Sequence, residues 1–266
     1  MGLRMVTLNL NGIRSAATKG FEAWAEAAGA DFMGVQEVRA QEADVAERFK
    51  RVAGLEGHFH YAQKKGYSGV GLYTKRAPSA VIAGFGCDEF DPEGRYVELR
   101  FDTSARKFSV ISAYFPSGSS GEERQAAKFR FLDRFWHHMA ALRASGREFI
   151  LMGDFNIAHQ AIDLKNWRGN QKNSGFLPEE RAWFSRMVSE ELGLVDVYRR
   201  LHPEATEDCY TWWSNRGQAW AKNVGWRLDY QVATPEIAHS AHAASIHKTS
   251  RFSDHAPLTI DYATSL

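Results

Sequence analysis

Apolar and polar positions follow two different periods through the first part of the chain. Residues 3–10 alternate as a half-buried strand does, and the alternation stops at Asn11-Gly12. Residues 31–36 indicate a second strand, while residues 18–28 and 41–52 carry apolar side chains at helical spacing. The pattern predicts a strand–helix–strand opening followed by an amphipathic helix.

The middle of the chain predicts further strands and one long helix. Segments 69–73, 95–101 and 108–114 follow one another without helices between them, which favours antiparallel pairing of the three. Residues 122–144 place large apolar side chains on one helical stripe, and Gly146 follows as a stop signal.

The apolar run 149–152 predicts a buried strand that ends at Asp154. A long polar loop over 155–177 and a helix over 178–192 come next. Loops longer than about 12–15 residues in a compact domain are usually functional or disordered, and the aromatic residues here argue against disorder. Short strands are then expected at 194–197, 209–213, 226–233, 241–247 and 256–262.

The organisation of the chain favours an α/β fold. No linker or low-complexity segment divides residues 1–266, so we expect one domain with two packed sheets and helices outside them. With 44% hydrophobic residues and eight tryptophans, the chain can fill a substantial core.

Composition also indicates where the protein acts and which partners it can bind. No stretch approaches the roughly 18–20 apolar residues of a membrane span, and the first residues lack the apolar centre of a signal peptide. Cys87 and Cys209 are too few for a disulfide framework and indicate reduced thiols in a cytoplasmic protein. The net charge of +1 argues against simple electrostatic capture of nucleic acid and leaves open an enzyme with a focused site.

Polar clusters stand where predicted strands meet loops. Their members are Asn9 and Asn11, Glu37, Asp154 and Asn156, Asp229, and Asp254 with His255. Each cluster alone has an ordinary explanation as a turn or a surface residue. Asp229 is harder to explain in this way, because a lone carboxylate buried in an apolar strand is unfavourable. Together the clusters indicate a site, since α/β proteins usually keep their sites at strand ends.

The residue types in these clusters point to phosphate chemistry. A carboxylate beside an amide, as in Asp154 and Asn156, suits the orientation of a water nucleophile and contact with phosphate oxygens. Oxygen ligands without zinc-type Cys or His spacing favour Mg²⁺, with Glu37 as the best single ligand candidate. The chain has no Gly-x-Ser-x-Gly elbow, Walker loop or Gly-x-Gly-x-x-Gly turn, which argues against a serine hydrolase or a nucleotide-binding fold.

The clusters belong to longer motifs that stand in a fixed order: Leu8-Asn9-Leu10-Asn11-Gly12-Ile13-Arg14, Val35-Gln36-Glu37, Gly66-Tyr67-Ser68-Gly69-Val70-Gly71, Ala113-Tyr114-Phe115-Pro116, Gly153-Asp154-Phe155-Asn156, Gly225-Trp226-Arg227-Leu228-Asp229-Tyr230 and Ser253-Asp254-His255. Through these motifs the chain resembles the exonuclease III / AP endonuclease family within the endonuclease/exonuclease/phosphatase fold. The resemblance runs from Leu8 to Asp261 and implies a four-layer α/β/β/α sandwich of two mixed sheets.

The family resemblance implies an enzyme of DNA repair. We expect cleavage of the backbone 5′ to abasic sites with Mg²⁺, or Mn²⁺ as its substitute, and an accompanying 3′→5′ exonuclease or 3′-end cleaning activity. The expected partner is double-stranded DNA with abasic sites or blocked 3′ ends. A monomer is expected, without membrane attachment, in a bacterial-type cytoplasm and on the nucleoid while it acts.

The resemblance also implies a metal-binding group. Glu37 would ligate Mg²⁺ directly, and Asn9, Asn11 and Asp254 would lie near the water shell of the ion. The family usually has Glu-Thr-Lys where this chain has Glu37-Val38-Arg39. Arg39 keeps the positive charge but presents a planar fork, and we expect it to contact substrate.

A second implied group carries the chemistry. Asp154 would act as the base for the attacking water, and Asn156 would contact the scissile phosphate. His255 would stabilise the charge on the phosphate, with Asp229 orienting its ring. Tyr114 would lie against the phosphate.

A third implied group binds the lesion. The loop around Asn170, Lys172 and Asn173 is similar to the loop that contacts the abasic nucleotide and backbone in AP endonucleases. Trp212, Trp226 and Leu228 match an apolar pocket for a flipped deoxyribose, with core packing as the plain alternative. Further DNA contacts are expected from Lys64, Lys65, Lys165, Arg168, Arg216, Lys222 and Arg251.

Other functions remain open at this point. The same residues fit an exonuclease III-type enzyme that acts mainly on 3′ ends. A phosphoinositide phosphatase or sphingomyelinase would share the fold, although the Asn-rich loop counts against it. A catalytically inert DNA-binding module is disfavoured, because each expected catalytic role has a residue to fill it.

Overall fold

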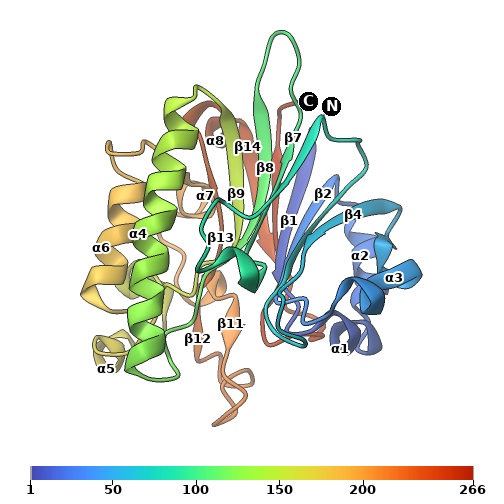
Figure 1. The fold of residues 1–266 in the computed structure, drawn as a ribbon. Helices are drawn as coiled ribbons and strands as arrows, with labels where there is room; N and C mark the ends of the chain where they lie inside the picture. The colour runs from blue at the N-terminus through green and yellow to red at the C-terminus, as the bar shows by residue number, and fades with distance from the viewer. Residues whose placement is uncertain (1, 266) are drawn as a thin grey trace.

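A computed structural model describes residues 2–265, in which two mixed β-sheets pack face to face (Figure 1). The first sheet has seven strands, in the order β14 (Ala241–Ile246), β15 (Leu258–Tyr262), β1 (Leu3–Asn9), β2 (Phe32–Gln36), β5 (Val70–Thr74), β4 (Leu55–His60) and β3 (Arg51–Val52). Within it β1 and β2 are parallel, and the other neighbours are antiparallel.

The second sheet has six strands, in the order β10 (Val195–Asp196), β13 (Asp229–Ala233), β9 (Glu148–Asp154), β8 (Phe108–Tyr114), β7 (Tyr96–Arg100) and β6 (Ala80–Ala83). Here β8 and β9 form the parallel pair. A small ribbon of β11 (Trp212–Trp213) and β12 (Gly225–Trp226) extends beyond the strand ends (Figure 1).

Helices cover the outer face of each sheet (Figure 1). On the first sheet these are α1 (Ile13–Thr18), α2 (Phe21–Ala28) and α3 (Glu42–Lys50). On the second they are α4 (Glu122–Ala144) and α6 (Pro178–Met187). The connections contain α5 (Trp167–Asn170), α7 (Val197–Leu201), α8 (Pro235–Ser240) and single 3₁₀ turns at Asp91–Glu93, Ala161–Asp163 and Glu207–Cys209. The predicted four-layer α/β/β/α sandwich is confirmed.

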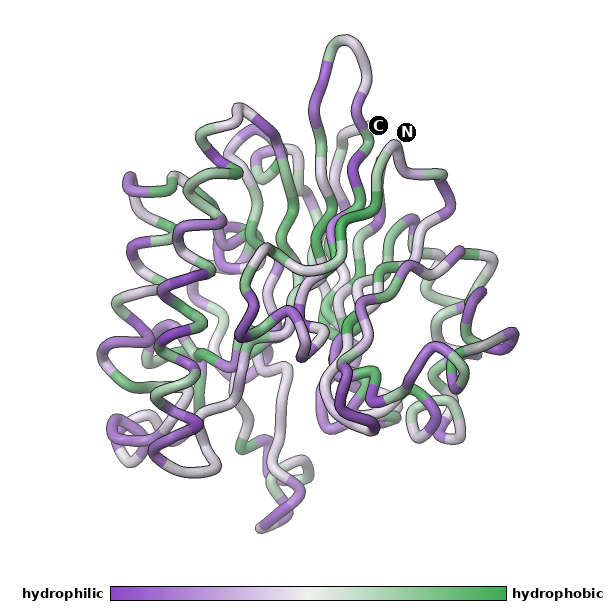
Figure 2. Tube along the Cα trace, in the orientation of Figure 1, coloured by the Kyte–Doolittle hydropathy of each residue, from purple (hydrophilic) through white to green (hydrophobic). Residues whose placement is uncertain are grey.

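Apolar side chains fill three layers of core. Between the sheets lie side chains of β1, β2, β5, β7, β8 and β9, such as Met5, Leu72 and Ile150, each fully buried. Separate clusters lie under the helices of each outer face. Figure 2 shows the same division, with hydrophobic residues concentrated on the strands and hydrophilic ones on the loops and outer helix faces. No helix within residues 2–265 is long and apolar enough to cross a membrane.

Three local predictions were wrong, one of them the helix expected over 178–192, which ends at Met187. The segment at β5 does not pair with β7, because it lies between β2 and β4 in the first sheet, where all five of its residues are buried. Sequence adjacency favoured the wrong partner for a strand that is covered on both faces. The helix expected over 18–28 corresponds to α2, which begins only at Phe21 because the chain turns at Gly20, whose φ is 100°; the separate helix α1 precedes it.

Strand register places the polar clusters side by side. Tyr114 pairs with Asp154 across β8 and β9, and Asp154 pairs with Asp229 across β9 and β13. In the first sheet Asn9 pairs with Gln36, the residue before Glu37. Parallel neighbours end at the same edge of a sheet, so each sheet delivers its polar strand ends to one place.

Gly153, immediately before Asp154, gives a test of this close packing. A Cβ atom there would lie 1.8 Å from the carbonyl oxygen of Ala113, and φ is 152°. We therefore expect Gly153→Ala to lower the free energy of unfolding by about 3 kcal/mol, measured by urea denaturation. Gly169→Ala is the control, because a Cβ atom at Gly169 meets nothing within 4 Å. Equal stability of the two variants would contradict the close approach of β8 and β9.

Candidate active site

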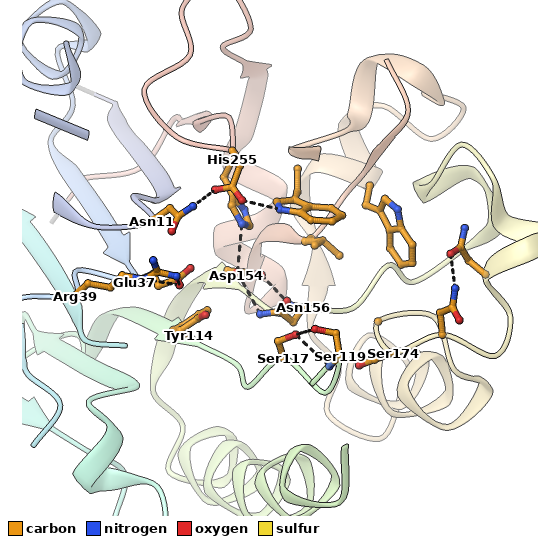
Figure 3. A pocket seen from close by; sticks show the side chains of 17 residues that line it. Asn11, Glu37, Arg39, Tyr114, Ser117, Ser119, Asp154, Asn156, Ser174 and His255 are labelled. Carbon is orange, nitrogen blue, oxygen red and sulfur yellow. Dashed lines mark hydrogen bonds and ion pairs between the residues drawn. The ribbon is translucent and has the colours of Figure 1, made fainter. Parts of the chain in front are cut away.

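A cavity of about 590 Å³ lies where the strand ends of the two sheets meet (Figure 3). Its lining residues are Asn11, Glu37, Arg39, Tyr114, Ser117, Ser119, Asp154, Asn156, Asn170, Asn173, Ser174, Gly175, Trp212, Trp226, Leu228, Asp254 and His255. Of the site residues predicted from sequence, Asn9 and Asp229 are buried behind this lining, and Lys172 is exposed outside it. The fold therefore brings nearly all of the predicted residues to one place.

His255 lies between two carboxylates at the base of the cavity. Its Nδ1 atom is 2.8 Å from Asp229 Oδ2, and its Nε2 atom is 3.8 Å from Asp154 Oδ2. The backbone amide of Asp229 donates to Thr211 Oγ1 at 3.1 Å, which fixes the strand that carries this carboxylate. All three side chains are buried, so they can act on one another with little screening by water.

Burial and charge set the protonation of these groups. Burial by itself lowers the pKa of His255, but the carboxylates of Asp229 and Asp154 outweigh it and raise the pKa to about 10. Burial raises the pKa of the Asp154 carboxyl, and the positive charge of His255 opposes the rise. The imidazole is therefore a cation at neutral pH, with its Nδ1–H donated to Asp229.

Asp154 is oriented by amides from both sheets. Asn9 Nδ2 donates to Asp154 Oδ2 at 2.9 Å and to Glu37 Oε2 at 2.9 Å, so one side-chain amide spans the two sheets. The backbone amide of Asn156 donates to Asp154 Oδ1 at 2.9 Å. The side-chain amide of Asn156 is anchored on the carbonyl of Phe115 at 3.0 Å. These contacts leave the Asp154 carboxylate with a fixed orientation at the cavity surface.

Glu37 and Asp254 form an acidic side of the cavity. Arg39 pairs with Glu37 Oε1 through its guanidinium, as Figure 3 shows. Asn11 Nδ2 donates to Asp254 Oδ1 at 2.8 Å, and Trp212 Nε1 donates to Asp254 Oδ2 at 3.2 Å. Burial would raise the pKa of Asp254, but the charge of His255 and these hydrogen bonds lower it. Asp254 therefore remains an anion.

Two groups of side chains are candidates for holding a metal ion. Asp154, Asp229 and His255 bring potential ligand atoms within 4.8 Å of one another. In this group the imidazole of His255 already contacts Asp229 at 2.8 Å and faces Asp154 at 3.8 Å, so an ion would have to replace those contacts. Glu37 and Asp254, with the nearby Asn11, offer oxygen atoms only, which suits a hard cation such as Mg²⁺.

Tyr114 lies beside these groups with its ring half-buried. The guanidinium carbon of Arg95 is 4.9 Å from the ring centroid. Burial raises the pKa of the Tyr114 hydroxyl, and the carboxylates of Glu37 and Asp154 raise it further. The phenol therefore keeps its proton and can donate a hydrogen bond into the cavity.

The opposite side of the cavity carries no charge. Asn173 Nδ2 donates to Asn170 Oδ1 at 2.8 Å, and Asn170 Nδ2 donates to the carbonyl of Asn166 at 2.8 Å. The rings of Trp212 and Trp226 meet edge to face, with centroids 6.3 Å apart. Both rings remain partly exposed in the cavity while packing on a small apolar cluster that includes Leu228. They therefore serve as cavity wall and as core at the same time.

Sequence reasoning missed three hydroxyl groups of the lining, those of Ser117, Ser119 and Ser174. The Oγ atoms of Ser117 and Ser119 are 2.8 Å apart (Figure 3). The Ser- and Gly-rich segment before α4 was the available signal, although such composition usually marks a plain loop. Of the lysines expected to contact DNA, Lys165 pairs with Glu207.

Comparison with known proteins agrees with this geometry. A model of the endonuclease/exonuclease/phosphatase family matches residues 6–255. A DNA-(apurinic or apyrimidinic site) endonuclease of Dictyostelium discoideum is 35% identical over 97% of this chain and 70% of its own length. An exodeoxyribonuclease of Bacillus subtilis is 34% identical over 97% of this chain and 98% of its own length.

Solved structures show the same similarity at the level of the fold. The crystal structure of an AP endonuclease from Leishmania major superposes with a TM-score of 0.89 at 26% identity, covering 99% of this chain and 88% of that one. The match of the family model over most of the chain, the two relatives and the shared fold together show that the chain belongs to the endonuclease/exonuclease/phosphatase family.

Proposed function

We propose that this protein is a DNA repair phosphodiesterase that cleaves the backbone 5′ to abasic sites, with an accompanying 3′→5′ exonuclease or 3′-end cleaning activity. The observation that carries the proposal is the single cavity in which a buried Asp154–His255–Asp229 group faces an uncharged wall of amides and indole rings. The first group suits phosphodiester hydrolysis, and the second suits a sugar without a base.

Asp154 is the proposed base. Its carboxylate takes a proton from the attacking water, whose oxygen bonds to phosphorus in line with the bond that breaks. The phosphorus–O3′ bond breaks, and O3′ leaves with the bonding electron pair and takes a proton from bulk water. The products are a 3′-hydroxyl and a 5′-phosphate on the abasic residue. The amides of Asn9 and Asn156 hold the carboxylate in the orientation that this proton transfer needs.

His255, Tyr114 and Asn156 are the proposed partners of the phosphate. The imidazolium supplies a positive charge and an N–H donor beside Asp154, and Asp229 keeps its ring in place. The phenol of Tyr114 supplies a neutral donor. The side-chain amide of Asn156, which donates to the carbonyl of Phe115 and to Asp154 Oδ2, would turn one N–H to the phosphate. Donors that are held before the reaction stabilise developing charge without reorganisation.

The proposed cofactor is Mg²⁺, with Mn²⁺ as a substitute. Glu37 would hold it, with Asp254, Asn9 and Asn11 near its water shell. When bound, the ion would neutralise phosphate charge as a Lewis acid. Arg39 already pairs with Glu37, and we propose that its fork contacts the DNA backbone when the carboxylate takes up a cation.

The uncharged wall is the proposed lesion pocket. Trp212, Trp226 and Leu228 would receive a flipped abasic deoxyribose, and Asn170 and Asn173 would bind its polar edge. A nucleotide with its base attached would not fit such a pocket. Lys172, exposed beside the cavity, would contact the DNA backbone.

The proposal extends to the organisation of the molecule. We propose one domain over residues 1–266, because β1, β2, β8, β9 and β13 from both sheets contribute to the cavity. The same cavity is complete within one chain, which supports a monomer. We propose action in a bacterial-type cytoplasm, on the nucleoid, and the similarity to the Bacillus subtilis exodeoxyribonuclease supports a bacterial setting.

An enzyme that acts mainly as a 3′→5′ exonuclease is the second candidate. The similarity over nearly the full length of the Bacillus subtilis exodeoxyribonuclease favours it. Both candidates use the same hydrolytic groups and differ in which DNA reaches them.

The direct test is cleavage of a duplex with one abasic site. With Mg²⁺ we expect a nick 5′ to the site, and with EDTA we expect none, because the acidic side of the cavity would lose its cation. An intact duplex of the same sequence is the control for selectivity, and blunt ends report exonuclease activity. A duplex left whole in Mg²⁺, together with phosphate release from an inositol polyphosphate, would contradict the proposal.

Asp154→Asn tests the proposed base. The variant keeps the shape of the side chain but cannot take a proton, so we expect the single-turnover rate to fall about 10³-fold. The dissociation constant for abasic DNA should not rise, because a negative charge facing phosphate is removed. Asp133→Asn, on the exposed face of α4, is the matched control for a lost carboxylate. Equal losses of rate and affinity would contradict the role of Asp154.

The protonation of His255 gives a pH test in metal-free protein. We expect its imidazole to lose its proton near pH 10, followed through its ring proton chemical shift and assigned with His255→Ala. Because this pKa exceeds the 6.5 of an unfolded histidine, the charge stabilises the fold fully below pH 6.5. That contribution is lost as the pH rises through 10.

Asp229→Asn is the companion variant for this titration. It removes the carboxylate that contributes most to raising the pKa of His255, so the midpoint should move to lower pH. A wild-type midpoint near 6.5, or one that Asp229→Asn leaves unchanged, would show that the imidazole is not held as a cation by its neighbours.

A further inference from the structure

Lys128 is a fully buried lysine on the inner face of α4, beneath the cavity. Its Nζ atom is 2.6 Å from Glu180 Oε1 and donates to the carbonyl oxygen of Asn156 at 2.7 Å. Glu180, near the start of α6, is also fully buried. A pair of charges withdrawn from water is weak evidence of stabilisation, since apolar residues of the same volume often stabilise a fold as well or better. Stabilisation of the fold therefore does not by itself explain why this ion pair is buried here.

The second oxygen of Glu180 fixes the end of the long loop 155–177, which carries part of the uncharged wall. Glu180 Oε2 accepts from the backbone amide of Gly175 at 2.7 Å and from that of Leu177 at 3.0 Å. Gln125, one turn before Lys128 on α4, donates to Glu180 Oε1 at 3.1 Å. The loop is thus fixed to the same ion pair that holds Asn156.

Gly175 is the point where the two halves of the cavity touch. Its φ is 91°, and its carbonyl accepts from the backbone amide of Ala158 at 2.7 Å. A Cβ atom there would lie 3.2 Å from the carbonyl oxygen of Asn156 and 3.4 Å from the ring of Trp226. A shift of Gly175 would therefore move the cavity wall against Asn156, which Figure 3 shows beside Asp154.

We propose that the Lys128–Glu180 ion pair is a positioning device. It fixes the position of Asn156 relative to the loop 170–175, which carries the amides of the uncharged wall. On this proposal the pair sets both the rate of cleavage and the preference for abasic over intact DNA. The inference rests on the proposed function. Lys128 and Glu180 are positioning residues, because they lie outside the cavity lining and act through Asn156 and Gly175.

The charges of the pair depend on each other. Burial lowers the pKa of Lys128, and the carboxylates of Glu180 and Asp154 oppose that change. Removal of one partner would leave the other charge buried and uncompensated, so a single deletion would report on stability as well as on position. A test of positioning must remove both charges together.

The double variant Lys128→Met/Glu180→Gln meets that requirement. It keeps the volume of both side chains and leaves no lone charge, so we expect a melting temperature close to that of the wild type. The carbonyl of Asn156 loses its donor, and we expect the single-turnover rate on abasic DNA to fall about 10-fold to 100-fold. The preference of binding for abasic over intact duplex, measured in EDTA, should fall with it.

A second variant distinguishes the effect of Lys128 on Asn156 from the effect of Glu180 on the loop. Lys128→Met/Glu180→Leu also removes the acceptor for the amides of Gly175 and Leu177. We expect it to bind abasic duplex more weakly than the Lys128→Met/Glu180→Gln protein, with the same affinity for intact duplex.

Arg147→Met/Asp102→Asn is the matched control. This ion pair, at 2.5 and 2.8 Å, stands just before β9, at the opposite end of the strand from Asp154. We expect it to leave rate and preference unchanged. Folded Lys128–Glu180 variants with wild-type rate and preference would overturn the inference while the proposed function stands. A wild-type protein that nicks no abasic duplex would overturn both.

Discussion

The ionised imidazole of His255, buried between Asp229 and Asp154, is the interaction on which the rest of the site depends. A buried cation needs carboxylates within a few ångströms, and two carboxylates at adjacent strand positions need a cation between them. The 2.8 Å contact with Asp229 and the 3.8 Å approach to Asp154 satisfy both demands. The charges of this group are therefore fixed by the folding of the second sheet and of the segment before β15.

The side-chain amide of Asn9 connects the first sheet to this group. Asn9 donates to Glu37 and to Asp154, which lie on different sheets, so the separation of the sheets determines whether the acidic side of the cavity faces the Asp154 carboxylate. Backbone strain accumulates here, with positive φ values at Asn11, Glu37 and Asn156. Non-glycine residues hold such conformations only where surrounding contacts enforce them, which is common at functional sites.

Much of this could be predicted from sequence, because periodicity locates strands and strand ends locate polar residues. The range of α4 and the end of β9 at Asp154 were of this kind. The pairing of strands could not be predicted in this way. All five residues of β5 are buried, so its hydrophobic pattern does not indicate which strand lies beside it. Lys128 was also beyond prediction: a lysine beside an apolar stripe indicates a solvated face, and its partner Glu180 is distant in sequence.

The cavity has a charged side and an uncharged side. In the proposed function, this division would let a chain with a net charge of +1 select one kind of DNA. Attraction to phosphate alone would favour every duplex equally. In the proposed function, the charged side, from Glu37 to His255, would act on the backbone that all DNA shares, whereas the wall of Trp212, Trp226 and amides would accept a sugar turned out of the helix. On this proposal selectivity depends on the relative position of the two sides, and Lys128 and Glu180, which lie outside the cavity lining, hold that position through Asn156 and Gly175.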